Sequence, residues 1–164
     1  MRSSLLLLIL TALLAVGCYS LSGISIDPTV RTYYVDLFDN RSPIADPDYP
    51  ARITEDLKEK VRTQTRLVYT ETDPDIEFGG AVTGWRVTSE APTGDQQISF
   101  NRLTIDLQVE YTDNSNEANS WKRRFSFFSD FSAEQNLLDV QETLLEEINE
   151  LLVEDIFNKA FTNW

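Results

Sequence analysis

Apolar and polar side chains alternate most regularly in the middle of the chain, over residues 103–111. Five apolar positions are separated there by single polar ones, which is the period of a β-strand with one buried face. The apolar set is Leu103, Ile105, Leu107, Val109 and Tyr111. Burying each of these side chains contributes about 1.5–3 kcal/mol before chain entropy is subtracted. This segment gives the strongest strand prediction in the sequence.

Shorter runs rich in β-branched and aromatic residues predict four further strands, at residues 30–38, 66–69, 76–87 and 121–128. In the first of them, the alternation places three apolar side chains on one face, those of Tyr33, Val35 and Leu37. The third contains glycines that indicate a bulge or a close backbone approach, namely Gly79, Gly80 and Gly84.

Two segments have the period of a helix. In residues 48–65, Ile53, Leu57 and Val61 lie four residues apart, and Pro50 suits a first helical turn. The second helix is predicted over residues 133–161, with Ser132 to Gln135 as a capping box. Its apolar face is predicted to contain Leu137, Val140, Leu144, Ile148, Leu151, Leu152 and Ile156. Its opposite face carries Glu142, Glu146, Glu150 and Glu154.

The predicted order of elements is β-α-β-β-β-β-α. Such an order is typical of an α+β domain in which both helices pack on one face of the sheet.

The N-terminus is typical of a bacterial lipoprotein signal. Arg2 precedes an apolar run over residues 5–16 that is shorter than the roughly 20 residues needed to span a bilayer. The run ends at Cys18, the only cysteine, after small residues, although a lipobox usually has Leu where Ala15 stands. We expect residues 1–17 to be a cleaved signal peptide and Cys18 to carry diacylglycerol and a further acyl chain such as palmitate. The alternative is an ordinary cleaved signal beside an incidental cysteine.

The rest of the chain divides into a short linker and one domain. Residues 18–29 are expected to form a lipidated N-terminus and an extended tether with a reach of at most about 35–40 Å. Residues 30–164 are expected to form a single domain, because their number is sufficient for a core that needs no disulfide.

Composition excludes several functions. The chain has 14 basic and 27 acidic residues, a net charge of −13, so a nucleic-acid partner is not expected. There is no histidine, which removes histidine-based triads and the commonest zinc ligand. No phosphate-binding loop of the GxxxxGK type is present, and no carboxylate pair stands in a context that would tune it for catalysis. We therefore expect no enzyme, no metal site and no cofactor.

One basic cluster stands out in this acidic chain, Lys122 to Arg124, which aromatic residues flank on both sides. Strand alternation places Lys122 and Arg124 on one face and Arg123 on the other. One interpretation is a protected sheet edge whose basic side chains pair with acidic neighbours such as Asp106 or Glu110. The other is a recognition patch for a phosphorylated amphiphile.

Several stretches of the sequence resemble the LptE family of lipopolysaccharide-assembly lipoproteins. They are CYSLSGISIDPTVRTYYVDLFDNRS at the mature start, then TEDLKEKVRTQTRL and DIEFGGAVTGW, and finally NRLTIDLQVEYTDN, FFSDFSAEQNLLDV and LVEDIFNKAFTNW. The resemblance covers nearly the whole mature chain. It implies two helices on a mostly four-stranded mixed or antiparallel sheet.

The resemblance also implies a function. Such a protein would be a lipoprotein of the outer membrane, anchored on its periplasmic side, that plugs and helps assemble the LptD β-barrel and assists lipopolysaccharide delivery to the cell surface. The family binds lipopolysaccharide through basic residues, for which the candidates in this sequence are Lys122, Arg123, Arg124 and Arg86. The alternative from another class is a free lipoprotein facing the periplasm that binds a different ligand or partner.

Overall fold

The computed structural model describes residues 23–90 and 99–162 and shows an α+β fold. Within these residues a six-stranded sheet has the order β3-β1-β4-β5-β6, with β2 also pairing with β4. The strands are β1 (Thr32–Val35), β2 (Asp39–Asn40), β3 (Val68–Tyr69), β4 (Ile76–Glu90), β5 (Phe100–Asp113) and β6 (Trp121–Ser132). The pairs β1–β3, β1–β4 and β2–β4 are parallel, whereas β4–β5 and β5–β6 are antiparallel.

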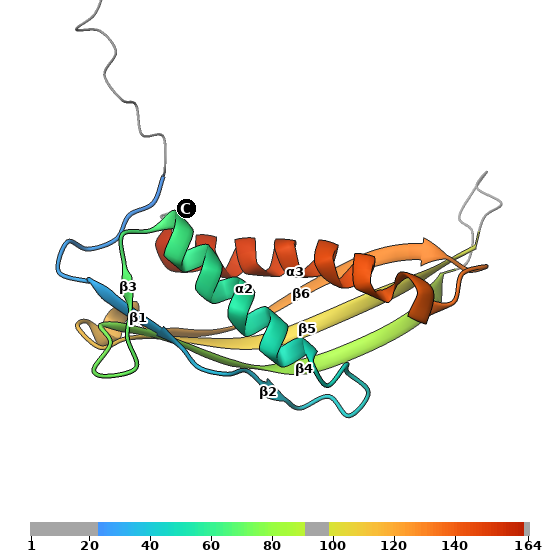
Figure 1. The fold of residues 1–164 in the computed structure, drawn as a ribbon, viewed down its shortest axis with the longest axis horizontal. Coiled ribbons are helices and arrows are strands. Elements are labelled where there is room, and N and C mark those ends of the chain that lie inside the picture. Colours follow the sequence, from blue (N-terminus) through green and yellow to red (C-terminus); the bar gives the residue numbers. More distant parts are fainter. Residues whose placement is uncertain (1–22, 91–98, 163–164) are drawn as a thin grey trace, which may run out of the picture.

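Two long helices, α2 (Tyr49–Gln64) and α3 (Leu137–Phe161), lie on the same face of this sheet (Figure 1). A short 3-10 helix, Glu117–Asn119, connects β5 to β6. The predicted fold class and the placement of both helices are confirmed. The sheet has six strands rather than mostly four, because β2 and β3, each of two residues, extend it beside β4 and β1.

The core lies between the helices and the sheet. All five predicted apolar residues of β5 are buried, as are Ile53, Leu57 and Val61 of α2. In α3 four residues of the predicted apolar face are buried: Leu144, Ile148, Leu152 and Ile156. Leu151 is 47 % exposed, however, and Val153 and Phe157 are buried in addition. The helix lies across β5 and β6 next to α2, so a wider strip of its surface is covered than one narrow stripe.

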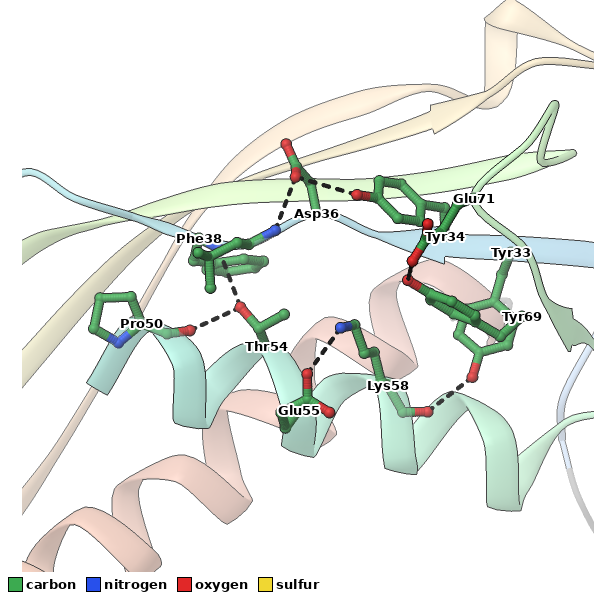
Figure 2. A network of polar contacts seen from close by, with 11 residues as sticks. Tyr33, Tyr34, Asp36, Phe38, Pro50, Thr54, Glu55, Lys58, Tyr69 and Glu71 are labelled. Atoms are coloured by element: carbon green, nitrogen blue, oxygen red, sulfur yellow. Dashed lines mark hydrogen bonds and ion pairs between the residues drawn. The ribbon is translucent and has the colours of Figure 1, made fainter. Parts of the chain in front are cut away.

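The chain bends after β1, and this bend reverses one prediction. Leu37, expected in the core, is 62 % exposed, and Phe38 is buried instead. Figure 2 shows the cause: the Asp36 carboxylate accepts the Leu37 N–H at 2.9 Å, and the Thr54 hydroxyl accepts the Phe38 N–H at 3.1 Å. Thr54 in turn donates to the carbonyl of Pro50 at 2.7 Å. The backbone therefore leaves the sheet register one residue earlier than alternation predicts.

The start of α3 also differs from the prediction. The contacts of the predicted capping box form, since the Ser132 N–H donates to Gln135 Oε1 and the Glu134 N–H donates to Ser132 Oγ, each at 3.3 Å. Ser132 is still the last residue of β6, however, and these contacts close a turn ahead of the helix. The N-cap is Asn136, whose side chain accepts the Leu138 N–H at 3.1 Å.

The segment before β1 lies against the domain. Ile24 forms a β-bridge with Thr162, and the Ser25 N–H donates to the carbonyl of Phe161 at 2.7 Å. Val30 is buried, and the Arg66 guanidinium donates to the carbonyl of Asp27 at 2.8 Å. Residues 24–29 were expected to be a free tether, but apolar contacts and these backbone bonds hold them on the core. The predicted signal peptide and Cys18 lie outside the described residues.

Among the residues that the structure describes, no helix combines the length and apolarity needed to cross a membrane.

Adjacent leucines of α3 test the observed core face. Leu152 is fully buried, so Leu152→Asp should lower the free energy of unfolding by several kcal/mol, because it buries an unpaired charge. Leu151→Asp, one residue away and half exposed, should change it by about 0.5 kcal/mol or less. Urea unfolding of both variants measures this. Equal destabilisation of the two variants would contradict the assignment of Leu152, and not Leu151, to the buried face of α3.

Candidate functional site: an arginine pair on the open face of the sheet

No helix or strand of the described residues covers the face of the sheet opposite α2 and α3 (Figure 1). The strand register places rows of mostly polar residues on this open face. The register aligns Gly79 with Glu110 and Lys122 in one row, and Ala81 with Gln108 and Arg124 in the next. The rows that follow are Gly84, Asp106 and Ser126, and then Arg86, Thr104 and Phe128. The side chains of these rows alternate with the buried ones of β5, so they all project from this open face.

Asp106, on the central strand β5, is the focus of the open face. Its carboxylate is only 1 % exposed although it lies on the uncovered side of the sheet. Arg86 from β4 and Arg124 from β6 converge on the same oxygen, Oδ2, and the Arg124 contact is 2.8 Å long. The two guanidinium-bearing side chains remain 50 % and 61 % exposed. One buried acid thus holds two half-exposed arginines side by side.

The neighbouring strand makes room for this carboxylate. The register of β4 shifts between Val82 and Gly84, which is the bulge that the glycines predicted. Gly84 then lies directly beside Asp106, and a Cβ atom at this position would overlap the carboxylate and lie 2.9 Å from Arg86 Nη1. Only a glycine allows Asp106 to lie flat against β4 and accept Arg86.

Asp106 remains ionised in this arrangement. Burial alone would raise its pKa, but the contacts with Ser126, Arg86 and Arg124 outweigh burial and hold the pKa below the ordinary value of 3.8. The cluster of one carboxylate and two guanidiniums therefore carries a net positive charge on the open face at neutral pH.

A shallow groove adjoins the cluster. Lys122 pairs with Glu110 at 2.7 Å at one side of it, and Tyr34 and Leu37 line the opposite side. Gly79 lies in its floor, where a Cβ atom would meet nothing within 4 Å. The groove has a volume of about 290 Å³, which is at the lower limit for a small-molecule pocket.

Beyond the cluster, Arg102 lies over an aromatic ring. Its guanidinium is 3.7 Å from the centroid of the Phe128 ring, and it pairs with both carboxylate oxygens of Asp130, at 2.7 and 2.9 Å. Phe128 is 49 % exposed. The open face therefore combines cations with an accessible aromatic surface.

The structure brings three of the four candidate residues together and separates the fourth. Arg86, Lys122 and Arg124 share the open face, while Arg123 projects from the helix face of β6, with its guanidinium 5.4 Å from the Phe125 ring centroid. The expected pairing of the basic cluster with Glu110 and Asp106 is confirmed. Lipopolysaccharide contact by any of the four stays a prediction.

The sequence patterns did not predict that Asp106 is buried or that Gly84 makes room for its carboxylate. Alternation correctly placed Asp106 on the polar face, but its burial depends on arginines from two other strands. The only available signals were the glycine at the bulge and the arginine two residues later. Within residues 23–90 and 99–162 there is no cluster of acidic or thiol side chains that could hold a metal ion.

Comparison with known proteins identifies one family. The model of the family described as "LptE: Lipopolysaccharide-assembly" matches residues 30–160. No curated protein matches the sequence.

Solved structures with a similar fold have little sequence identity. The hypothetical protein CT253 from Chlamydia trachomatis superposes with a TM-score of 0.52 at 6 % identity, over 80 % of this chain and 98 % of that one. Protein XCC0632 from Xanthomonas campestris superposes with a TM-score of 0.51 at 10 % identity, over 82 % of this chain and 87 % of that one. The PelC dodecamer from Paraburkholderia phytofirmans superposes with a TM-score of 0.50 at 14 % identity, over 82 % of this chain and 90 % of that one. At these identities the likeness concerns the fold alone.

Two glycines of β4 test whether Asp106 needs the space that Gly84 leaves beside it. Gly84→Ala should lower the free energy of unfolding by about 1–3 kcal/mol, because its methyl group overlaps the carboxylate. Gly79→Ala, in the same strand but with open space around it, is the matched control and should be nearly neutral. Chemical denaturation distinguishes the two. If both variants were equally stable, the predicted overlap between a Cβ atom at position 84 and the Asp106 carboxylate would be wrong.

The ionisation of Asp106 predicts a pH dependence. Because its pKa is lowered in the folded protein, its contribution is fully present above about pH 4 and is lost as the pH falls through the folded pKa. Asp106→Asn should therefore destabilise the protein at pH 7 by about 1.5–3 kcal/mol, and by progressively less as the pH falls below about 4. Urea unfolding of both proteins across this range provides the measurement. A difference that does not vary with pH would exclude the proposed charge interaction.

Proposed function

The chain belongs to the LptE family of lipopolysaccharide-assembly proteins, and we propose that it is a non-enzymatic lipoprotein of the outer membrane. In this proposal Cys18 is acylated and holds the domain on the periplasmic side. The domain plugs and helps assemble the LptD β-barrel and assists the delivery of lipopolysaccharide to the cell surface. The observation that carries the ligand part of the proposal is the arginine pair on the open face.

The chemistry of the pair suits the phosphate groups of a glycolipid. A guanidinium has five N–H donors in a planar fork, and both Arg86 and Arg124 use only part of this set on Asp106. Because Asp106 positions both groups before a ligand arrives, little side-chain entropy remains to be lost on binding. Lys122 adds a third cation in a neighbouring row, and Phe128 offers an apolar surface for acyl or sugar groups.

The net charge of −13 requires such contact to be local. A broad surface of this charge repels a phosphorylated lipid, whereas on the open face β6 carries Lys122 and Arg124 against the single acid Asp130. The open face beside β6 is therefore the region where an anion meets the least repulsion.

The exterior also suits a plug inside a barrel. The lumen of an outer-membrane barrel is polar, so its occupant needs a surface of charged and hydrogen-bonding groups. The exposed face of α3 carries Glu142, Glu146, Glu150 and Glu154. The large exposed apolar side chains of the described residues are distributed over several elements and their connections: Leu37, Ile44, Val68, Tyr69, Val87, Phe128, Leu138 and Leu151. Such a surface is compatible with protein and water around it.

The ligand part of the proposal is tested with charge-matched variants. Lys122→Gln/Arg124→Gln removes two cations from the open face but leaves Arg86 on Asp106, so the variant should fold. Its affinity for purified lipopolysaccharide should fall about tenfold or more for each lost contact, because charge-assisted bonds contribute about 1.5–3 kcal/mol. The control, Lys58→Gln/Arg62→Gln, makes the same charge change on α2 and should bind normally. Binding at low and high salt provides the measurement.

An equal loss of lipopolysaccharide affinity in both variants would mean that affinity follows net charge rather than the open face.

The proposed plugging of the barrel is tested separately, by extracting the native protein in mild detergent. Co-extraction with a large β-barrel is expected, and extraction of the free lipoprotein would favour the alternative of a periplasm-facing binding protein.

A further inference from the structure

Gly79 is the one glycine of β4 that the packing of the described residues does not explain. At Gly84 a Cβ atom would overlap the Asp106 carboxylate, and at Gly80 it would lie 2.7 Å from the Phe38 ring. At Gly79 a Cβ atom would meet nothing within 4 Å, and φ lies outside the left-handed region that favours glycine. Glycine weakens the interior of a strand, and it often marks a place where a ligand approaches the backbone closely.

The bare backbone at Gly79 is the floor of the shallow groove, and one wall of this groove is aromatic and apolar. The Tyr34 hydroxyl donates to the Asp36 carboxylate at 3.5 Å, and the Tyr34 and Tyr69 ring centroids are 5.9 Å apart (Figure 2). Leu37 joins this wall because the bend after β1 turns its side chain away from the core. The bend therefore exposes an apolar side chain at the groove.

Carboxylates outnumber cations in the groove. Its lining includes Asp36, Asp39, Glu77, Glu110, Arg41 and Lys122. Two ion pairs hold part of this set in place, Glu110 with Lys122 at 2.7 Å and Asp39 with Arg41 at 2.8 Å. Because the lining is net negative, a phosphate is favoured at the adjacent arginine pair and not over Gly79. A carboxylate has about four sites for hydrogen bonds, so these acids can still accept from further donors.

A sugar ring combines what the two walls offer. Its hydroxyl groups donate hydrogen bonds to carboxylates without adding a charge, and its C–H face can pack against an aromatic ring such as that of Tyr34. The groove volume of about 290 Å³ suits a small polar unit of this kind, lying against the exposed backbone of Gly79.

The groove and the arginine pair are near enough for one ligand to occupy both. Gln108 lines the groove and is aligned with Arg124 in the strand register. On β5, Glu110 of the groove and Asp106 of the arginine pair are four residues apart, a distance of about 13 Å. A headgroup of linked sugar rings that carries a phosphate can span this distance.

We propose that the groove over Gly79 is a sugar-binding subsite, which takes an uncharged sugar ring of a phosphorylated glycolipid while Arg86 and Arg124 take its phosphate. The inference rests on the proposed function and adds the part of the ligand that is recognised beside the phosphate. Sugars and phosphates are hydrated groups, so both subsites can act within the polar lumen of a barrel.

Filling the groove from its floor tests the subsite. Gly79→Leu should fold, because open space surrounds the added side chain, which then occupies the place of the sugar. Its affinity for purified lipopolysaccharide should fall about tenfold. Its affinity for phosphatidic acid in detergent micelles, which has a phosphate and acyl chains but no sugar, should be unchanged. The control Thr88→Leu adds an apolar side chain at an exposed position of the same strand and should bind both lipids normally.

The outcomes separate the subsite from the proposed function. Unchanged lipopolysaccharide affinity in folded Gly79→Leu would overturn the sugar subsite and leave the arginine pair as a phosphate site. An equal loss for both lipids would also overturn it, because the groove would then not distinguish a sugar. Normal lipopolysaccharide binding with lost co-extraction of the barrel would assign the groove to the partner protein instead. If Lys122→Gln/Arg124→Gln bound lipopolysaccharide normally, the proposed ligand site itself would fail.

A second measurement uses the unsubstituted protein. Deacylated lipopolysaccharide, which keeps the sugars and phosphates, should shift the amide NMR signals of both Gly79 and Arg124 in isotope-labelled protein. Inorganic phosphate should shift the signal of Arg124 and leave that of Gly79 in place. Shifts confined to the arginine pair with both ligands would overturn the sugar subsite.

Discussion

The open face of this domain depends on one buried carboxylate that two strands neutralise from opposite sides. Asp106 lies on the central strand, and Arg86 and Arg124 reach it from β4 and β6. Removing both partners would leave a buried charge unpaired, which typically costs about 3–5 kcal/mol. The bulge at Val82 and Gly84 exists at the point where the carboxylate needs space. The register of β4, β5 and β6, the bulge in β4 and the ion pairs of Asp106 therefore depend on one another.

The two faces of the sheet, and its two ends, have different roles. One face is covered by α2 and α3 and forms the core, whereas the opposite face presents cations and the Phe128 ring. The chain enters at the end where Ile24 pairs with Thr162, next to the C-terminus of α3. A lipoprotein domain with this arrangement can be held at one end while a ligand contacts its open face.

Sequence patterns predicted what depends on one element and missed what depends on several. The alternation in β5 and the stripe of α2 identified the core correctly because each side chain there follows the period of its own element. Leu37 was assigned to the wrong side because Thr54, on a different element, captures the Phe38 N–H and bends the chain. The pairing of Arg124 with Asp106 followed from alternation, but the burial of Asp106 needed Arg86 and the bulge as well. In residues 24–29 only Ile24 and Ile26 alternate with polar residues, a pattern too short to predict that they pack on the core beside the distant Phe161.

In the proposed function, lipopolysaccharide binds the open face of the sheet rather than the helix face. The most direct measurement is photocrosslinking in living cells, with benzoylphenylalanine at Phe128 on the open face and at Leu151 on α3. These positions are 49 % and 47 % exposed, so they are matched in accessibility. A lipopolysaccharide adduct is expected from position 128 and none from position 151. An adduct from position 151 alone would contradict binding at the open face.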